Sequence, residues 1–354
     1  MKYQLINPIN QSYSTIEQIL TNRGVPYNEV YHYLNTTDND INSFKELDVL
    51  KLRAAAKILM KTIQDNHRCL IIVDSDADGF TSSAILINYL YDLFPVWVKN
   101  KIDYRVHEGK QHGLNDHIDW ILKENESLSD NWYSYYSLVI IPDAGSNDVN
   151  ECTRLKQNGI DTIILDHHIC DIENPDAIVI NNQLSDYPNK DFSGAGVVWQ
   201  FCRYLDALLD INNADNYTDL MALGNCADMM SMLSIETKHL INKGFHNLKN
   251  PFFVNLSEKN AFSMNNKINH MSVAFYVAPY INAICRSGTI EEKTLTFESM
   301  LKYKAFKMLP STKRGHAPGE MEQLVEQVMR VVTNVKNRQT KAQEAGLQTI
   351  EKMI

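Results

Sequence analysis

The chain has 354 residues, of which 44% are apolar, and its 34 basic and 43 acidic side chains give a formal net charge of −9. This size is sufficient for one large α/β unit or for two smaller domains with buried cores. The negative charge excludes a protein that grips nucleic acid by bulk positive charge, so any polyanion must be held locally. The six cysteines form no C-x-x-C pair, and no signal peptide or apolar run of 18 residues is present. We therefore expect reduced thiols, a cytoplasmic location and no membrane segment.

Helices and strands are predicted to alternate over the first half of the chain. We expect a helical N-terminal extension over residues 1–45, with a short helix at 14–20 that packs onto the core, and a second helix at 47–65. Four apolar runs predict strands, and a helix follows the first of them at 81–93; the runs are 70–73, 138–142, 162–165 and 177–180. Alternation of this kind predicts an α/β fold with a parallel sheet.

The pattern from Gly194 onward is mainly helical. The stretch from Gly319 to the C-terminus carries Leu and Val at helical spacing as far as Val335 and then becomes polar. Such a stripe is typical of a helix that packs along only part of its length. We divide the chain into the extension 1–45, a main domain 46–310 and a C-terminal connecting helix 311–354.

Carboxylates and histidines follow three of the predicted strands directly. They are Asp74, Asp76 and Asp78 after the first strand, Asp143 after the second, and Asp166, His167 and His168 after the third; Asp228 lies in a helical stretch further on. Because the carboxyl ends of parallel strands meet at one edge of a sheet, we expect these side chains to converge. Carboxylates with a minority of imidazoles favour Mg²⁺ or Mn²⁺ over zinc, and manganese fits the histidine best.

Each of these residues also has a structural interpretation. A single Asp after a strand is commonly a turn residue or a helix cap, which applies to Asp143 and most of all to Asp78. Asp228 can cap a helix, and the adjacent histidines can be one buried and one surface residue. The coincidence of four such positions with the same ligand chemistry favours the metal site.

The same residues resemble the motifs of the DHH phosphoesterases, and within them the branch of RecJ-like single-strand-specific DNA exonucleases. Residues 73–81 are similar to the first motif, Asp143 is the centre of the second, Asp166-His167-His168 is the third, and 224–228 is similar to the fourth. Further similar segments are 108–109, 112–115, 193–197 and 279–283 together with Arg286. Their order holds from about residue 15 to the C-terminus.

The resemblance implies a DHH-type catalytic domain over 46–310 that hydrolyses phosphodiesters with two divalent cations, manganese preferred and magnesium possible. It implies five metal ligands: Asp74 on one cation, Asp76 and His167 on the other, Asp143 as a bridge, and Asp228. It also implies other site residues, namely His168 to hold the scissile phosphate, Asp166 to orient the histidines, Asp78 as a further catalytic candidate and His112 as a substrate contact. Arg105 and Arg286 are candidate substrate contacts because a guanidinium matches the geometry of phosphate oxygens.

The leading hypothesis is a 5′-to-3′ exonuclease on single-stranded DNA, with the polarity taken from the resemblance alone. The alternatives are a phosphodiesterase for short oligonucleotides or cyclic dinucleotides, and a non-catalytic subunit that recruits a replication or repair partner. The resemblance also implies a second, glycine-rich lobe, whereas this chain has 14 glycines and no two are adjacent. We expect this lobe to be absent from the chain and hypothesise that a protein partner supplies it.

Overall fold

The computed structural model describes residues 8–109, 112–127, 135–170 and 172–351, so the outermost residues of the predicted extension and connecting helix lie outside the description. Five strands form one parallel sheet in the order β2-β1-β3-β4-β5; they are β1 Arg68–Val73, β2 Ile102–Val106, β3 Tyr136–Pro142, β4 Asp161–Asp166 and β5 Ile178–Asn181. The predicted parallel α/β sheet is confirmed. We did not predict β2, because Asp103, Tyr104 and Arg105 interrupt its apolar pattern; as an edge strand it pairs only with β1.

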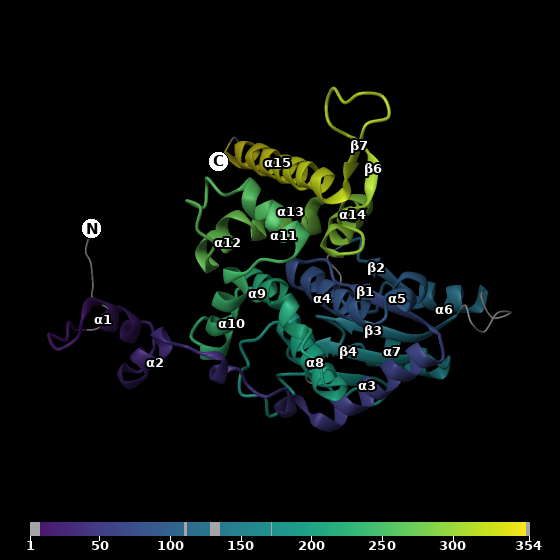
Figure 1. Cartoon of the computed structure of the whole chain (residues 1–354), viewed down its shortest axis with the longest axis horizontal. Coiled ribbons are helices and arrows are strands. Elements are labelled where there is room, and N and C mark those ends of the chain that lie inside the picture. Colours follow the sequence, from purple (N-terminus) through teal and green to yellow (C-terminus); the bar gives the residue numbers. More distant parts are fainter. Residues whose placement is uncertain (1–7, 110–111, 128–134, 171, 352–354) are drawn as a thin grey trace.

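Helices cover both faces of the sheet (Figure 1). One face packs against α3 Val49–Gln64, α4 Ala77–Leu93 and α8 Gly194–Leu209, and the other against α6 Ile118–Ser127 and α7 Val149–Gln157. Neighbouring residues of a strand point to opposite faces, so Ile71 lies in the first core and Ile72 in the second. Since both faces are covered, the central strands are almost entirely apolar.

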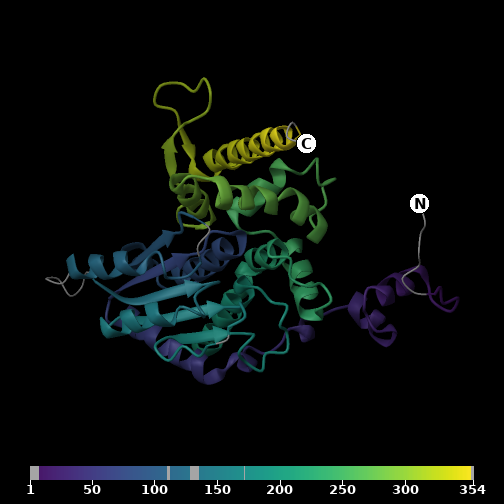
Figure 2. The same ribbon diagram turned by 180° about the vertical axis from the view of Figure 1, so that it is seen from behind.

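The chain after α8 forms a mainly helical second part that lies beside the sheet (Figures 1 and 2). Its elements are α9 Thr218–Ala227, α10 Ile235–His246, α11 Pro251–Lys259, α12 His270–Tyr276, α13 Ala278–Ser287, α14 Ile290–Met300, β6 Met308–Pro310, β7 Met321–Gln323 and α15 Leu324–Glu351; α5 Pro95–Lys101 belongs to the sheet part. None of the helices in the described ranges has the length and apolar composition of a membrane span.

The C-terminal helix α15 begins later than the sequence predicted. Residues 308–323 form an antiparallel hairpin in front of it, because β6 and β7 pair with each other. The apolar stripe from Leu324 to Val335 is buried against α11, α13 and α14, and the helix is exposed from Thr340 onward. As expected, the first part of this helix packs against the protein and its last part does not.

The first helices of the N-terminal extension lie apart from the sheet (Figure 1). Helix α1, Thr15–Asn22, starts at a capping box formed by Ser14 and Glu17, and none of its residues is buried. Ile16 and Ile19 remain about half exposed, at 50% and 48%. The expectation that this helix packs onto the core was wrong, because its short apolar face contacts α2, Val30–Leu34, and the turn at 27–29 instead.

Glu236 of α10 joins the extension to the main domain. Its carboxylate is 3% exposed and accepts hydrogen bonds from the backbone and side-chain nitrogens of Asn42, each at 2.8 Å. It also accepts from the Tyr187 hydroxyl at 2.7 Å and from Asn189 Nδ2 at 2.9 Å. One buried carboxylate thus satisfies donors from two separate parts of the chain, Asn42 in the extension and residues 187–189 in the main domain.

Glu236→Ala is expected to lower the free energy of unfolding by about 3 kcal/mol, because it leaves these buried donors without an acceptor. The matched control is Glu258→Ala on α11, where the side chain is exposed and the loss should stay within about 0.5 kcal/mol. Urea unfolding of both variants measures the difference. Equal stability of the two variants would contradict the role given to Glu236.

Candidate metal centre

The predicted ligands meet at the carboxyl edge of the sheet. Asp74 follows β1, Asp143 follows β3 and Asp166 ends β4, and each is 1% exposed. Asp76 caps the N-terminus of α4 and accepts a hydrogen bond from the Gly79 amide at 2.8 Å. The sheet therefore brings together residues that are up to 92 positions apart in sequence, between Asp74 and Asp166.

The described residues contain three groups of possible ligands, and within each group the ligand atoms lie within 4.8 Å of one another. The groups are Asp74 with Asp76 and His112, Asp143 with His167 and His168, and Asp78 with His167 and Asp228. All five predicted metal ligands occur in these groups. His112, which we expected to contact substrate, lies among the ligands, because its Nδ1 is 2.5 Å from Asp74 Oδ2. Asp76 lies with Asp74 and His112, whereas the resemblance implied that it shares a cation with His167.

His167 is the common member of two of these groups. Its Nε2 atom lies 3.2 Å from Asp143 Oδ1, 3.6 Å from Asp228 Oδ2 and 3.8 Å from Asp78 Oδ2. Burial lowers the pKa of His167, so the ring is neutral near pH 7. A neutral imidazole surrounded by carboxylates is an arrangement that a divalent cation completes.

Several carboxylate oxygens of the cluster have no hydrogen-bond donor within the described part of the chain. Both oxygens of Asp143 and Oδ1 of Asp74 are buried and unpaired. Burial, followed by the nearby Asp78 and Asp76, raises the pKa of Asp143 well above its usual value. Burial and neighbouring carboxylates likewise raise the pKa of Asp76 to about 6 and that of Asp228 to about 7. Unpaired buried oxygens of this kind fit a hard divalent cation.

Asp166 is occupied by hydrogen bonds within the protein. Its Oδ1 accepts from the amides of His167 and His168, at 2.7 and 3.2 Å, and from His168 Nδ1 at 2.8 Å, while Oδ2 accepts from the Ser146 amide. Burial alone would raise the pKa of Asp166, but these hydrogen bonds outweigh it and the pKa is lowered. The geometry suits a residue that orients both histidines.

His168 faces a pocket beside the carboxylates. Its side chain is 49% exposed and lines this pocket together with His112 and residues 144–148. The hydrogen bond with Asp166 raises the pKa of His168 to about 9, so the ring is protonated near pH 7. A protonated imidazole at this place can donate to an anionic substrate.

Asp78 joins two helices at their N-termini. Its oxygens accept hydrogen bonds from Ser193 Oγ at 2.9 Å and from the amides of Gly194 and Ala195 at 2.7 and 3.2 Å. A carboxylate at the positive end of α8 is favoured by the exposed amides there. These contacts agree with the structural role that the sequence analysis considered for Asp78. The residue caps the N-terminus of α8, however, and not the turn at Gly79.

Arg105 points away from the carboxylates. Its guanidinium lies 4.3 Å from the ring centre of Trp120, and its Nε donates to His117 Nδ1 at 3.0 Å. His117 Nε2 in turn lies 3.0 Å from His107 Nδ1. Arginine can only donate, so His117 Nδ1 accepts and His117 carries its proton on Nε2. That proton is donated to His107 Nδ1, so His107 also carries its proton on Nε2. His107 then directs an N–H toward Asp74 Oδ1, 3.9 Å away.

The structure adds His107 to the residues around the site and leaves Arg286 as a prediction. His107 follows β2 directly, the position that Asp74 and Asp143 hold after their strands. Recognising β2 from the sequence would have identified His107 as well.

Arg286 is exposed in the last turn of α13, next to Cys285. The Cys285 carbonyl accepts a hydrogen bond from Ser75, which lies between Asp74 and Asp76.

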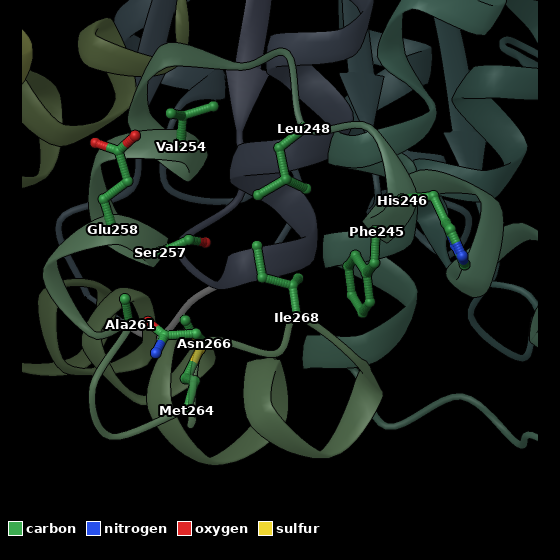
Figure 3. A pocket seen from close by; sticks show the side chains of 10 residues that line it. All are labelled: Phe245, His246, Leu248, Val254, Ser257, Glu258, Ala261, Met264, Asn266 and Ile268. Atoms are coloured by element: carbon green, nitrogen blue, oxygen red, sulfur yellow. The ribbon is translucent and has the colours of Figure 1, made fainter.

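A second pocket lies between α10, α11 and the segment 261–268 (Figure 3). Its lining is mostly apolar and contains none of the predicted site residues. The two ionisable side chains in it, His246 and Glu258, lie on opposite sides and do not converge (Figure 3). This pocket offers no catalytic arrangement.

Gly194→Ala is expected to weaken Mn²⁺ binding at least tenfold. A Cβ at this position would lie 2.3 Å from Asp143 Oδ1, so the carboxylate would have to move. The matched control is Gly346→Ala in the exposed part of α15, where no atom lies within 4 Å and the change should add about 0.5 to 1 kcal/mol of helix stability. Calorimetric titration with Mn²⁺ compares the two. Wild-type affinity in Gly194→Ala would refute the placement of Asp143.

Comparison with known proteins agrees with this geometry. Residues 68–225 match the family "DHH family, N-terminal domain". The chain is 33% identical over 347 residues to a putative SPbeta prophage-derived single-strand DNA-specific exonuclease, YorK, of Bacillus subtilis, with 98% of this chain and 56% of that protein covered. It is 30% identical over 265 residues to the Bacillus subtilis single-stranded-DNA-specific exonuclease RecJ, with 73% and 31% covered.

A solved structure of RecJ from Thermus thermophilus in complex with Mn²⁺ has the same fold. The TM-score is 0.67 at 21% identity, and the match covers 91% of this chain and 43% of that one. The chain spans about half or less of the length of the relatives named here. On the strength of the matched domain and of these relatives, the chain belongs to the DHH family and is RecJ-like within it.

Proposed function

We propose that this chain is a metal-dependent phosphodiester hydrolase that degrades single-stranded DNA from the 5′ end. The observation that carries the proposal is a set of buried carboxylate oxygens that have no hydrogen-bond donor among the described residues, namely both oxygens of Asp143 and Oδ1 of Asp74. His167 Nε2 lies 3.2 Å from Asp143 Oδ1, and His112 contacts the other oxygen of Asp74. The names of the relatives support single-stranded DNA as the substrate. The polarity follows from the family resemblance.

Two groups of side chains would hold the cations, and the fit rests on the donor set described above. Asp74, Asp76 and His112 would hold one, and His167 with Asp143 and Asp228 would hold the other. Two divalent cations, when bound, would lower the pKa of a water molecule and neutralise negative charge on the phosphoryl oxygens. Manganese suits the two imidazoles better than magnesium does.

The remaining groups bind and orient the substrate. His168, protonated near pH 7, would donate a hydrogen bond to a non-bridging phosphate oxygen in the pocket that it lines. Asp166 holds the His168 ring in place through Nδ1 and fixes the backbone of His167. His167 stays neutral because it is buried, which leaves a ring nitrogen able to act as a ligand. Arg286 would contact the strand from α13.

The cellular setting is part of the same proposal. All six cysteines are free, and five of them are buried, which suits a reducing compartment such as the cytoplasm. Single-stranded DNA is the proposed partner, and a protein that supplies the second lobe of the RecJ-like arrangement is a further proposed partner.

Millimolar Mn²⁺ is expected to raise the melting temperature, because binding to the folded chain alone adds about 2.7 kcal/mol at 100 times the dissociation constant. His167→Ala should abolish most of this shift while the melting temperature in EDTA changes little. The control is Cys170→Ser, two residues beyond His168. It should behave as wild type because its thiol donates to the carbonyls of Ser146 and Ile172, which a hydroxyl can also do. Differential scanning fluorimetry gives both values. Equal damage by the two substitutions would argue for a thiolate-containing site.

Hydrolysis assays with Mn²⁺ on strands labelled at either end test the substrate and the polarity. We expect the 5′ label to be released first, and His167→Ala to be slower by at least a factor of 100, because removal of a ligand disrupts the cation site. Faster cleavage of dinucleotides or cyclic dinucleotides than of long strands would favour the small-substrate enzyme. Mn²⁺ binding without hydrolysis of any of them would favour the non-catalytic subunit.

A further inference from the structure

Lys293 of α14 is the only lysine or arginine that is buried within the described residues, with an exposure of 2%. Its ammonium lies between two loops of the sheet edge. The nitrogen is 2.8 Å from Ser75 Oγ, 2.8 Å from the Glu108 carbonyl and 3.1 Å from the His107 carbonyl. An ammonium has three N–H groups, so these three acceptors satisfy it.

The acceptors belong to the two loops that supply one group of metal ligands. Ser75 stands between Asp74 and Asp76, and residues 107–108 lead from β2 toward His112. Ser75 also donates to the carbonyl of Cys285 in α13 at 3.2 Å. Two helices of the second part of the chain therefore fix the loop on which Asp74 and Asp76 stand.

This arrangement has an electrostatic cost. No carboxylate among the described residues lies within 4.0 Å of the Lys293 nitrogen, so its hydrogen-bond partners are neutral oxygens, and the carboxylates of Asp74 and Glu108 act on the charge only from a greater distance. Burying a charge without a counter-ion costs several kcal/mol. A methionine of similar length would avoid that cost but would leave the three acceptors without their donor, so the lysine serves the two loops rather than the packing of α14.

We propose that Lys293 is a positioning residue that holds the loops of Asp74, Asp76 and His112 in the geometry that binds a divalent cation. The inference rests on the proposed metal function. It assigns Ser75 a definite part as the acceptor that connects Lys293 and α13 to the ligand loop. It goes beyond the ligands themselves, because neither Lys293 nor Ser75 belongs to the groups of candidate ligands.

Lys293 can affect cation binding in two opposite ways. Whether Lys293→Met raises or lowers the affinity for Mn²⁺ distinguishes them. A positive charge near the site repels Mn²⁺, so a purely electrostatic role predicts tighter binding in Lys293→Met. Positioning predicts weaker binding, because the loops lose their shared anchor. Ser75→Ala keeps the charge and removes only the connection, so it tests positioning without the electrostatic change.

The experiment is calorimetric titration of the full chain with Mn²⁺, together with the paramagnetic resonance spectrum of the bound ion. We expect Lys293→Met to bind about 10- to 100-fold more weakly, the range typical of residues that support ligands. Ser75→Ala should bind several-fold more weakly, and the loss in the double variant should be smaller than the sum of the two single losses, since both substitutions remove the hydrogen bond between Lys293 and Ser75. The melting temperature of Ser75→Ala in EDTA should stay close to that of wild type.

The matched control is Lys302→Met, just after α14, where the lysine pairs with Asp92 instead. It should bind Mn²⁺ as wild type does and give the same resonance spectrum. Wild-type affinity in both Lys293→Met and Ser75→Ala, or tighter binding in Lys293→Met, would overturn the inference while leaving the metal function intact. If Lys293→Met does not fold, Ser75→Ala alone decides. Failure of the wild-type chain to bind Mn²⁺ would overturn the proposed function as well.

Discussion

Repulsion among buried carboxylates is the constraint on which the rest of this structure depends. Two unit charges 4 Å apart interact with about 4 kcal/mol at the effective dielectric constant found near protein surfaces. Here Asp78, Asp143 and Asp228 lie around His167, while Asp74 and Asp76 lie with His112. Several oxygens of these carboxylates have no donor among the described residues. Such a cluster must either take up protons, as the raised pKa values of Asp143 and Asp228 indicate, or bind cations. The chemistry of the site follows from this choice.

The surrounding fold keeps these carboxylates in place from several directions. Asp78 ties the start of α4 to the start of α8, and glycines at 194 and 224 leave room for Asp143 and Asp78, because a Cβ at either would lie 2.3 Å from a carboxylate oxygen. Asp166 fixes both histidines through three hydrogen bonds and accepts a fourth from the Ser146 amide. Elements far apart in sequence therefore determine one geometry, which agrees with rigid support for a metal site.

The sequence could predict the ligands because two simple regularities coincide in them. Strands that are buried on both faces appear as apolar runs, and the residues that follow such runs must meet at one edge. This logic places Asp74, Asp143 and His167 without any knowledge of the packing. The logic did not find His107. This residue follows β2, an edge strand whose central residues are polar, so the sequence shows no apolar run there.

Other features depend on tertiary contacts that no local pattern encodes. Arg105 was expected at the substrate, but its direction depends on which face of β2 it occupies, and that face packs on Trp120. Lys293 has the sequence context of an exposed helical lysine, and only the packing of α14 against two loops buries it. The N-terminal helix has an apolar face that predicts burial, yet it is too short to reach the core and packs on its own neighbours.

The most direct test of the central claim is anomalous diffraction from crystals of the full chain soaked in Mn²⁺. The account predicts two anomalous peaks at the carboxyl edge of the sheet, one beside Asp74, Asp76 and His112 and the other beside His167 and Asp143. Peaks confined to other carboxylates on the surface, or an empty cluster in which Asp143 is held by a hydrogen bond, would contradict it.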